Sequence, residues 1–153
     1  MTRHAHNRVS TFYLAASSGN NGENAEAGLR AKGAMADLVD MGYTNSYDWT
    51  TNLADPVTDY PQLAVVDIGR ARNASLFVLL AEPATYGGMV ELGARLGGGG
   101  IAHVVGGDHF FFHHPAVCRY PTWQAFLLWA RDQADRDVCT ETRPCLNCRA
   151  SDR

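Results

Sequence analysis

A run of five consecutive apolar residues, Leu76 to Leu80, constrains the fold of this chain more than any other segment. Such a strand carries apolar side chains on both of its faces, so both faces must be covered. Strands of this kind are typical of parallel sheets, whose neighbouring strands are joined by crossover connections that are usually helices. The run therefore predicts a central strand of an α/β fold.

The rest of the chain alternates between strand-like and helix-like segments. Further strands are predicted at Val9–Ala16, Tyr43–Trp49 and Ile101–Val105. Helices are predicted at Ala25–Met41, from Asp59 to Asn73, at Met89–Leu96 and at Thr122–Arg136. This alternation predicts a doubly wound, mostly parallel sheet, which binds ligands at the carboxyl ends of its strands, near the point where the strand order reverses.

Length predicts a single domain. A chain of 153 residues is large enough to bury a core of its own, and it contains no internal repeat. We expect residues 9–136 to form the domain, residues 1–8 to form a disordered arm and residues 137–153 to form a poorly ordered tail.

The charge and hydropathy patterns exclude several classes of partner. The net charge is −3 and no basic stretch is present, so binding of polymeric nucleic acid through its phosphates is not expected. No apolar run is long enough to span a membrane. The polar, histidine-rich start from Met1 to Asn7 lacks a signal-peptide core, which favours a cytoplasmic location.

Three of the four cysteines, Cys139, Cys145 and Cys148, lie in the polar tail. Their spacing lacks the two Cys-x-x-Cys pairs of a usual zinc site. We therefore predict free thiols and no metal, with a zinc site shared with a histidine or with another subunit as the alternative. No cofactor is expected.

The segment from Gly87 to Ala94 contains one acidic residue, Glu91, directly after the central strand and its loop. The sequence predicts that Glu91 lies in the first turn of a helix. Unpaired N–H groups and the helix dipole would hold a carboxylate ionised there. Such a group at the carboxyl edge of a sheet can act as a nucleophile or as an electrostatic stabiliser.

A second carboxylate, Asp67, lies among apolar residues in the segment Leu63 to Ile68. A buried carboxylate needs a partner or a task, because burial without either costs free energy. The ordinary interpretation is an ion pair with Arg70 or Arg72. The functional one is that Asp67 and Glu91 divide the roles of acid and nucleophile.

Polar residues near the ends of the first and central strands are candidates for substrate binding. Tyr13 is either a core tyrosine or a hydroxyl that orients Glu91. Ser17 opens the loop that runs to Asn24, which is either a flexible turn or a rim that binds a small polar ligand. Thr85 and Tyr86 are either turn residues or sugar-contacting hydroxyls.

An aromatic and histidine-rich segment runs from Asp108 to Pro115. The adjacent His113 and His114 do not have the spacing of metal ligands on one face. We interpret the segment as a loop that packs at a subunit interface or over a pocket.

Three pieces of this chain resemble the nucleoside 2-deoxyribosyltransferase family in its broad sense, which includes N-glycosidases of nucleoside 5′-monophosphates. They are Tyr13 to Ser17, Val66 to Ala74 and Gly87 to Ala94, and the resemblance covers roughly Val9 to Ala130. It implies a flavodoxin-like or Rossmann-like sandwich with a mostly parallel, five-stranded sheet.

The resemblance also implies roles for single residues. Glu91 would be the nucleophile at the anomeric carbon and Tyr13 would position it. Asp67 would give a proton to the leaving base or contact the sugar. Ser17 and Thr85 fall where relatives contact the sugar or a 5′-phosphate. The remaining substrate-binding candidates are Tyr86, Gly87 and Gly88.

The function expected from these residues is metal-independent cleavage or exchange of the N-glycosidic bond of a (deoxy)nucleoside. One alternative is a deoxynucleoside 5′-monophosphate N-hydrolase. An alternative of another class is a non-catalytic nucleotide-binding or sensor domain, because a fold does not determine an activity. The resemblance further implies a homodimer or higher homo-oligomer, with the segment Phe110 to His114 as the candidate interface.

Overall fold

The computed structural model describes residues 10–17, 25–51 and 60–135, which form one five-stranded sheet. All neighbouring strands are parallel, in the order β2-β1-β3-β4-β5. The strands are β1 (Thr11–Ala15), β2 (Thr44–Asn45), β3 (Leu76–Leu80), β4 (Ala102–Val105) and β5 (Val117–Tyr120). The predicted α/β, flavodoxin-like architecture is confirmed.

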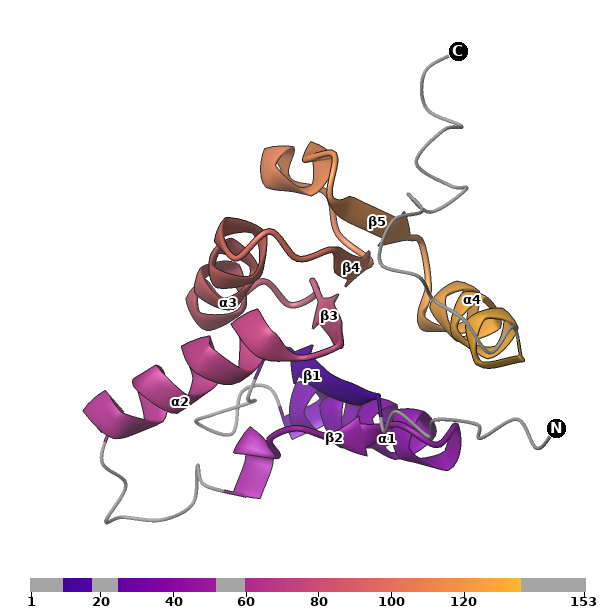
Figure 1. Cartoon of the computed structure of the whole chain (residues 1–153), viewed down its shortest axis with the longest axis horizontal. Coiled ribbons are helices and arrows are strands. Elements are labelled where there is room, and N and C mark those ends of the chain that lie inside the picture. The colour runs from indigo at the N-terminus through magenta and orange to yellow at the C-terminus, as the bar shows by residue number, and fades with distance from the viewer. Residues whose placement is uncertain (1–9, 18–24, 52–59, 136–153) are drawn as a thin grey trace, which may run out of the picture.

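Helices cover both faces of the sheet, as a doubly wound fold requires. The helices are α1 (Ala25–Asp40), α2 (Tyr60–Asn73), α3 (Tyr86–Gly97) and α4 (Trp123–Asp135), with two 3₁₀ turns, η1 (Trp49–Thr51) and η2 (Phe110–His113). Helices α2 and α3 lie side by side on one face, and α4 lies on the other (Figure 1). Trp123 at the start of α4 donates to Asp37 of α1 at 2.7 Å, which ties these two helices together on that second face.

The strand order reverses between β1 and β3. These two strands are neighbours in the sheet, although β2 and two helices separate them in sequence. The connections from β1 and β3 leave toward opposite sides, so a crevice forms beyond their carboxyl ends. The sequence locates the residues after Ala15 and after Leu80 at this crevice.

The structure differs from the prediction at the start of one helix and in one strand that was not predicted. Helix α3 begins at Tyr86 instead of Met89, so part of the predicted loop Glu82–Gly88 is helical. The strand β5 was not located in the sequence, because its four residues include an exposed Arg119 that breaks the apolar pattern. The connection from β4 to β5 contains the turn η2 and no α-helix.

Arg95 fixes the end of α3 against the end of α2. Its Nε donates to the carbonyl of Ile101 at 2.9 Å, and its Nη1 donates to the carbonyls of Arg72 and Ala74 at 3.0 and 2.8 Å. Carbonyl groups at a helix end lack partners within the helix, so this guanidinium satisfies them. The contact holds the two helices that carry Asp67 and Glu91 in a defined relation.

Several predictions lie outside the described residues. These are the N-terminal arm, most of the loop that follows Ser17, and the tail with Cys139, Cys145 and Cys148.

Cys118 of β5 is buried and disulfide-bonded. No helix in the described part of the chain is long and apolar enough to cross a membrane.

Candidate active site

A hydrogen bond joins the central strand pair to helix α3. Tyr13 of β1 is fully buried, and its hydroxyl donates to Glu91 Oε1 at 2.8 Å. The ring of Tyr13 lies nearly parallel to that of Phe77 on β3, with 6.1 Å between the ring centroids. Packing against Phe77 fixes the ring, so the hydroxyl is held toward Glu91 by the core.

The start of α3 determines where Glu91 lies. Thr85 is the N-cap residue, and its Oγ1 accepts from the backbone N–H of Gly88 at 3.0 Å. Since the helix begins at Tyr86, Glu91 lies in the second turn, and the first turn contains no acidic residue. The prediction that free N–H groups of the first turn hold Glu91 ionised is therefore wrong.

The pKa of Glu91 is raised to about 7. Burial is the main cause, the hydrogen bond from Tyr13 lowers the pKa, and the nearby charge of Asp67 raises it. Burial and the charge of Glu91 also raise the pKa of Tyr13, so this hydroxyl remains protonated and can donate. Glu91 thus changes its charge in the neutral range, where a catalytic carboxylate can both accept and release a proton.

Asp67 of α2 belongs to the same cluster, because its charge acts on both Tyr13 and Glu91. Its Oδ1 is buried and has no hydrogen-bond partner among the described residues. Burial raises its pKa to about 6, and no arginine lowers it. The alternative of an ion pair with Arg70 or Arg72 is therefore wrong for the part of the chain that the structure describes.

Two carboxyl groups with pKa values of about 6 and about 7 act on Tyr13. Between these values the pair binds one proton on average, and the proton can reside on either group. A pair that holds one proton can supply an acid and a base, or an acid and a nucleophile, at the same time. No arginine among the described residues neutralises either group, so both are available for chemistry.

The other predicted site residues lie around the starts and ends of these elements. Ser17 follows β1 and is buried, whereas Tyr86 and Gly87, at the exposed start of α3, face solvent. Tyr86 is 95% exposed. Gly88 is buried, and its N–H is already used by Thr85. Substrate contacts by these residues remain predictions.

Gly88 allows the close approach of α3 to β3. A Cβ at this position would lie 2.9 Å from Leu79 Cδ1 and 3.0 Å from Thr85 Oγ1. We expect Gly88→Ala to destabilise the fold by about 1–3 kcal/mol through overpacking and to displace Glu91. Urea unfolding measures the first effect. Gly87→Ala is the matched control, because no atom lies within 4 Å of a Cβ there. Equal stability of the two variants would contradict this packing role.

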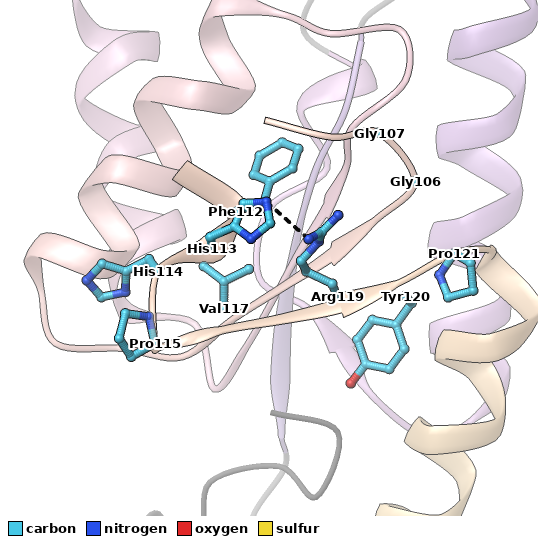
Figure 2. Close-up of a pocket in the computed structure, with 10 residues that line it drawn as sticks. All are labelled: Gly106, Gly107, Phe112, His113, His114, Pro115, Val117, Arg119, Tyr120 and Pro121. Carbon is cyan, nitrogen blue, oxygen red and sulfur yellow. Dashed lines mark hydrogen bonds between the residues drawn. The ribbon is translucent and has the colours of Figure 1, made fainter. Parts of the chain in front are cut away.

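A pocket of about 570 Å³ lies elsewhere, along β5 (Figure 2). None of the predicted site residues lines it. Its walls include Phe112, His113 and His114 of the connection from β4 to β5, which contains no α-helix. Arg119 inside it contacts Asp108 at 3.0 Å and His113 at 3.3 Å. Asp108 is exposed, and an exposed ion pair of this kind contributes little to stability.

Among the described residues, no group of three or more histidine, cysteine, aspartate or glutamate side chains is placed so that it could hold a metal ion. Two further residues near Tyr13 were not predicted from the sequence. Tyr47 lies close enough to raise the pKa of Tyr13 further. Ser46 has a buried hydroxyl that finds no hydrogen-bond partner in the described part of the chain. Both follow β2, and only their position at a strand end could have drawn attention to them.

Comparisons with known proteins bear on the fold. No family model matches the sequence, and no curated protein matches it. Among solved structures, the chain is similar to the CMP N-glycosidase of Clostridium botulinum, with a TM-score of 0.50 and 14% sequence identity. The match covers 79% of this chain and 98% of the other. At this identity the similarity shows a shared fold.

Proposed function

We propose that the protein breaks the N-glycosidic bond of a nucleoside or nucleotide, with Glu91 as the nucleophile. The observation that carries the proposal is the 2.8 Å hydrogen bond from the buried Tyr13 to Glu91, beside a second unneutralised carboxylate at Asp67. The cluster belongs to the strands where ligands bind in a sheet of this order. The similarity in fold to an N-glycosidase agrees with this chemistry.

The proposed reaction has two steps. Cleavage of a nucleoside C–N bond leaves positive charge on the pentose ring and negative charge on the base. Glu91 Oε2 bonds to the anomeric carbon as the C–N bond breaks, and the electron pair of that bond goes to the base. Asp67 gives its proton to the base. The glycosyl ester on Glu91 is then attacked by water or by another base, which frees the carboxylate.

Two substrate classes fit this chemistry, and the first is a nucleoside. A nucleoside 5′-monophosphate is the second candidate, because the solved structure with the same fold is a CMP N-glycosidase. Transfer and hydrolysis share the first step, so both are compatible with the Tyr13–Glu91 pair.

A homo-oligomer is part of the proposal. The aromatic residues Phe110 and Phe111 of η2 are 69% and 52% exposed. Large exposed aromatic side chains side by side are typical of a protein interface. A second copy that covers η2 is the partner we propose.

Incubation with a panel of nucleosides and their 5′-monophosphates tests the function. Each substrate is supplied with and without a second free base, and the products are separated by chromatography. We expect free base from at least one substrate, and a swapped nucleoside where transfer occurs. Absence of product from the whole panel, with substrate binding retained, would instead support a non-catalytic binding domain.

The pH dependence follows from the order of the two pKa values. In the active form Glu91 is ionised and Asp67 is protonated, although the pKa of Asp67 is lower than that of Glu91. We therefore expect kcat/KM to rise to about pH 6, to stay level and to fall above about pH 7.

Tyr13→Phe should change this profile in a specific way. Loss of the hydrogen bond raises the pKa of Glu91, by about one unit. In the plot of kcat/KM against pH, the fall at high pH then moves up by about one pH unit. The value of kcat/KM in the level region falls about tenfold, while the rise at low pH stays in place. Measuring kcat/KM from pH 4 to 9 checks this. A fall in rate without movement of the alkaline limb would contradict the assignment of Glu91 to that limb.

A further inference from the structure

Ser46 lies beside Tyr13 although it comes after the end of β2. The register of the two strands pairs Thr11 with Thr44 and Phe12 with Asn45. The backbone N–H of Ser46 donates to the carbonyl of Phe12 at 2.8 Å, which continues the same parallel pattern by one step. Ser46 is therefore the neighbour of Tyr13 across the sheet.

The side chain of Ser46 projects on the face that carries the candidate site. Asn45 Nδ2 contacts Met35 Sδ of α1 at 3.5 Å, so Asn45 faces α1. Successive side chains of a strand point to opposite faces. Ser46 thus points away from α1, to the face on which Tyr13 reaches Glu91 and on which α2 lies.

Two buried polar atoms on this face have no partner in the part of the chain that the structure describes. They are Ser46 Oγ and Asp67 Oδ1. Buried polar atoms are nearly always hydrogen-bonded, and an exception calls for an explanation, since leaving one unpaired costs free energy. Ser46 is the neighbour of Tyr13 in the sheet, and Asp67 of α2 lies near enough for its charge to act on Tyr13. A small hydroxyl-bearing molecule that reaches both atoms would satisfy them.

We propose that Ser46 and Asp67 bind the water molecule that hydrolyses the glycosyl ester on Glu91, an inference that rests on the function proposed above. The water oxygen bonds to the anomeric carbon, and the bond from that carbon to the Glu91 oxygen breaks. Its electron pair returns to the Glu91 carboxylate. Asp67, which has given its proton to the base, takes one proton from the water. Ser46 is a positioning residue that orients this water.

The consequence is that hydrolysis, and not transfer, is the main reaction of this protein. A bound water is in place whenever the base departs, whereas a second base must first diffuse in. The Ser46 hydroxyl affects only the step in which water attacks. Its loss leaves formation of the glycosyl ester unchanged.

The partition between the two outcomes tests the inference. The full-length protein is incubated with a substrate that it cleaves and with the same base in isotopically labelled form. Free pentose reports hydrolysis, and labelled nucleoside or nucleotide reports transfer. We expect Ser46→Ala and the near-isosteric Ser46→Cys to lower the ratio of hydrolysis to transfer by about tenfold. Thr44→Ala, which removes an exposed hydroxyl two residues earlier on the same face, should leave the ratio unchanged.

The possible results separate the two proposals. An unchanged ratio in a folded Ser46 variant would overturn the water assignment while leaving the nucleophile untouched. A raised KM with an unchanged ratio would also overturn it, and would assign Ser46 to a substrate hydroxyl instead. If the wild-type protein releases no base from any substrate, the proposed function itself fails, and the Ser46 variants are not needed to show it.

Discussion

Glu91→Gln is expected to lower base release by about 10³-fold or more while leaving the protein folded. The amide keeps the shape of the side chain and can still accept from Tyr13, but it cannot form the glycosyl ester. Release of free base, measured by chromatography, checks the activity. Glu26→Gln is a control for charge, because Glu26 is an exposed residue in the first turn of α1. Wild-type turnover in Glu91→Gln would contradict a nucleophilic role.

The same substitution should stabilise the fold at high pH. The pKa of Glu91 is raised from 4.5 to about 7 in the folded protein, so ionising this group costs folding free energy. The wild type therefore loses stability as the pH rises from about 4.5 to about 7, and glutamine avoids this loss. We expect Glu91→Gln to be more stable by up to about 3 kcal/mol at pH 8, and equally stable at pH 4. Urea unfolding at both pH values measures the difference. If the difference in free energy of unfolding between the two proteins is the same at both pH values, Glu91 is not buried in its charged form.

Asp67→Asn is expected to lower the rate on natural substrates by about 10²- to 10⁴-fold, the usual contribution of a general acid. The asparagine cannot give a proton to the leaving base. An aryl pentoside that releases p-nitrophenolate needs no such proton, so its cleavage should fall much less. Comparing kcat/KM for the two substrates separates loss of the acid from general damage.

Equal losses on both substrates would contradict the role of Asp67 as proton donor. The charge of Asp67 also raises the pKa of Glu91, so the variant should hold Glu91 ionised at lower pH. Glu91→Gln, in contrast, should lose activity on both substrates alike. The two variants thus identify which carboxylate attacks and which one gives the proton.

The core of the fold was predictable because burial leaves few arrangements for an apolar run. Leu76 to Leu80 became the strand β3 at the centre of the sheet, as expected for residues covered on both faces. Helix α2 began at Tyr60, next to the predicted start at Asp59. The strand β5 escaped prediction, because its exposed Arg119 interrupts a short apolar run.

The contact between Tyr13 and Glu91 was predictable from the sequence, and the electrostatics around it were not. Tyr13 and Glu91 were named from the sequence, and the structure joins them by a hydrogen bond. The helix start was misplaced because Gly87 and Gly88 favour a loop, whereas Gly88 is needed for packing against Leu79. The raised pKa of Glu91 arises from burial by elements far away in sequence, which no local pattern reports. The position of Ser46 beside Tyr13 follows only from the register of β1 and β2.

Mass spectrometry of the protein quenched in acid during turnover tests the nucleophile most directly. The account predicts a pentosyl adduct on the peptide that contains Glu91, absent from Glu91→Gln and lost when the substrate is exhausted. Base release by the wild type with an adduct on a different side chain, or with unchanged rates in Glu91→Gln, would contradict it.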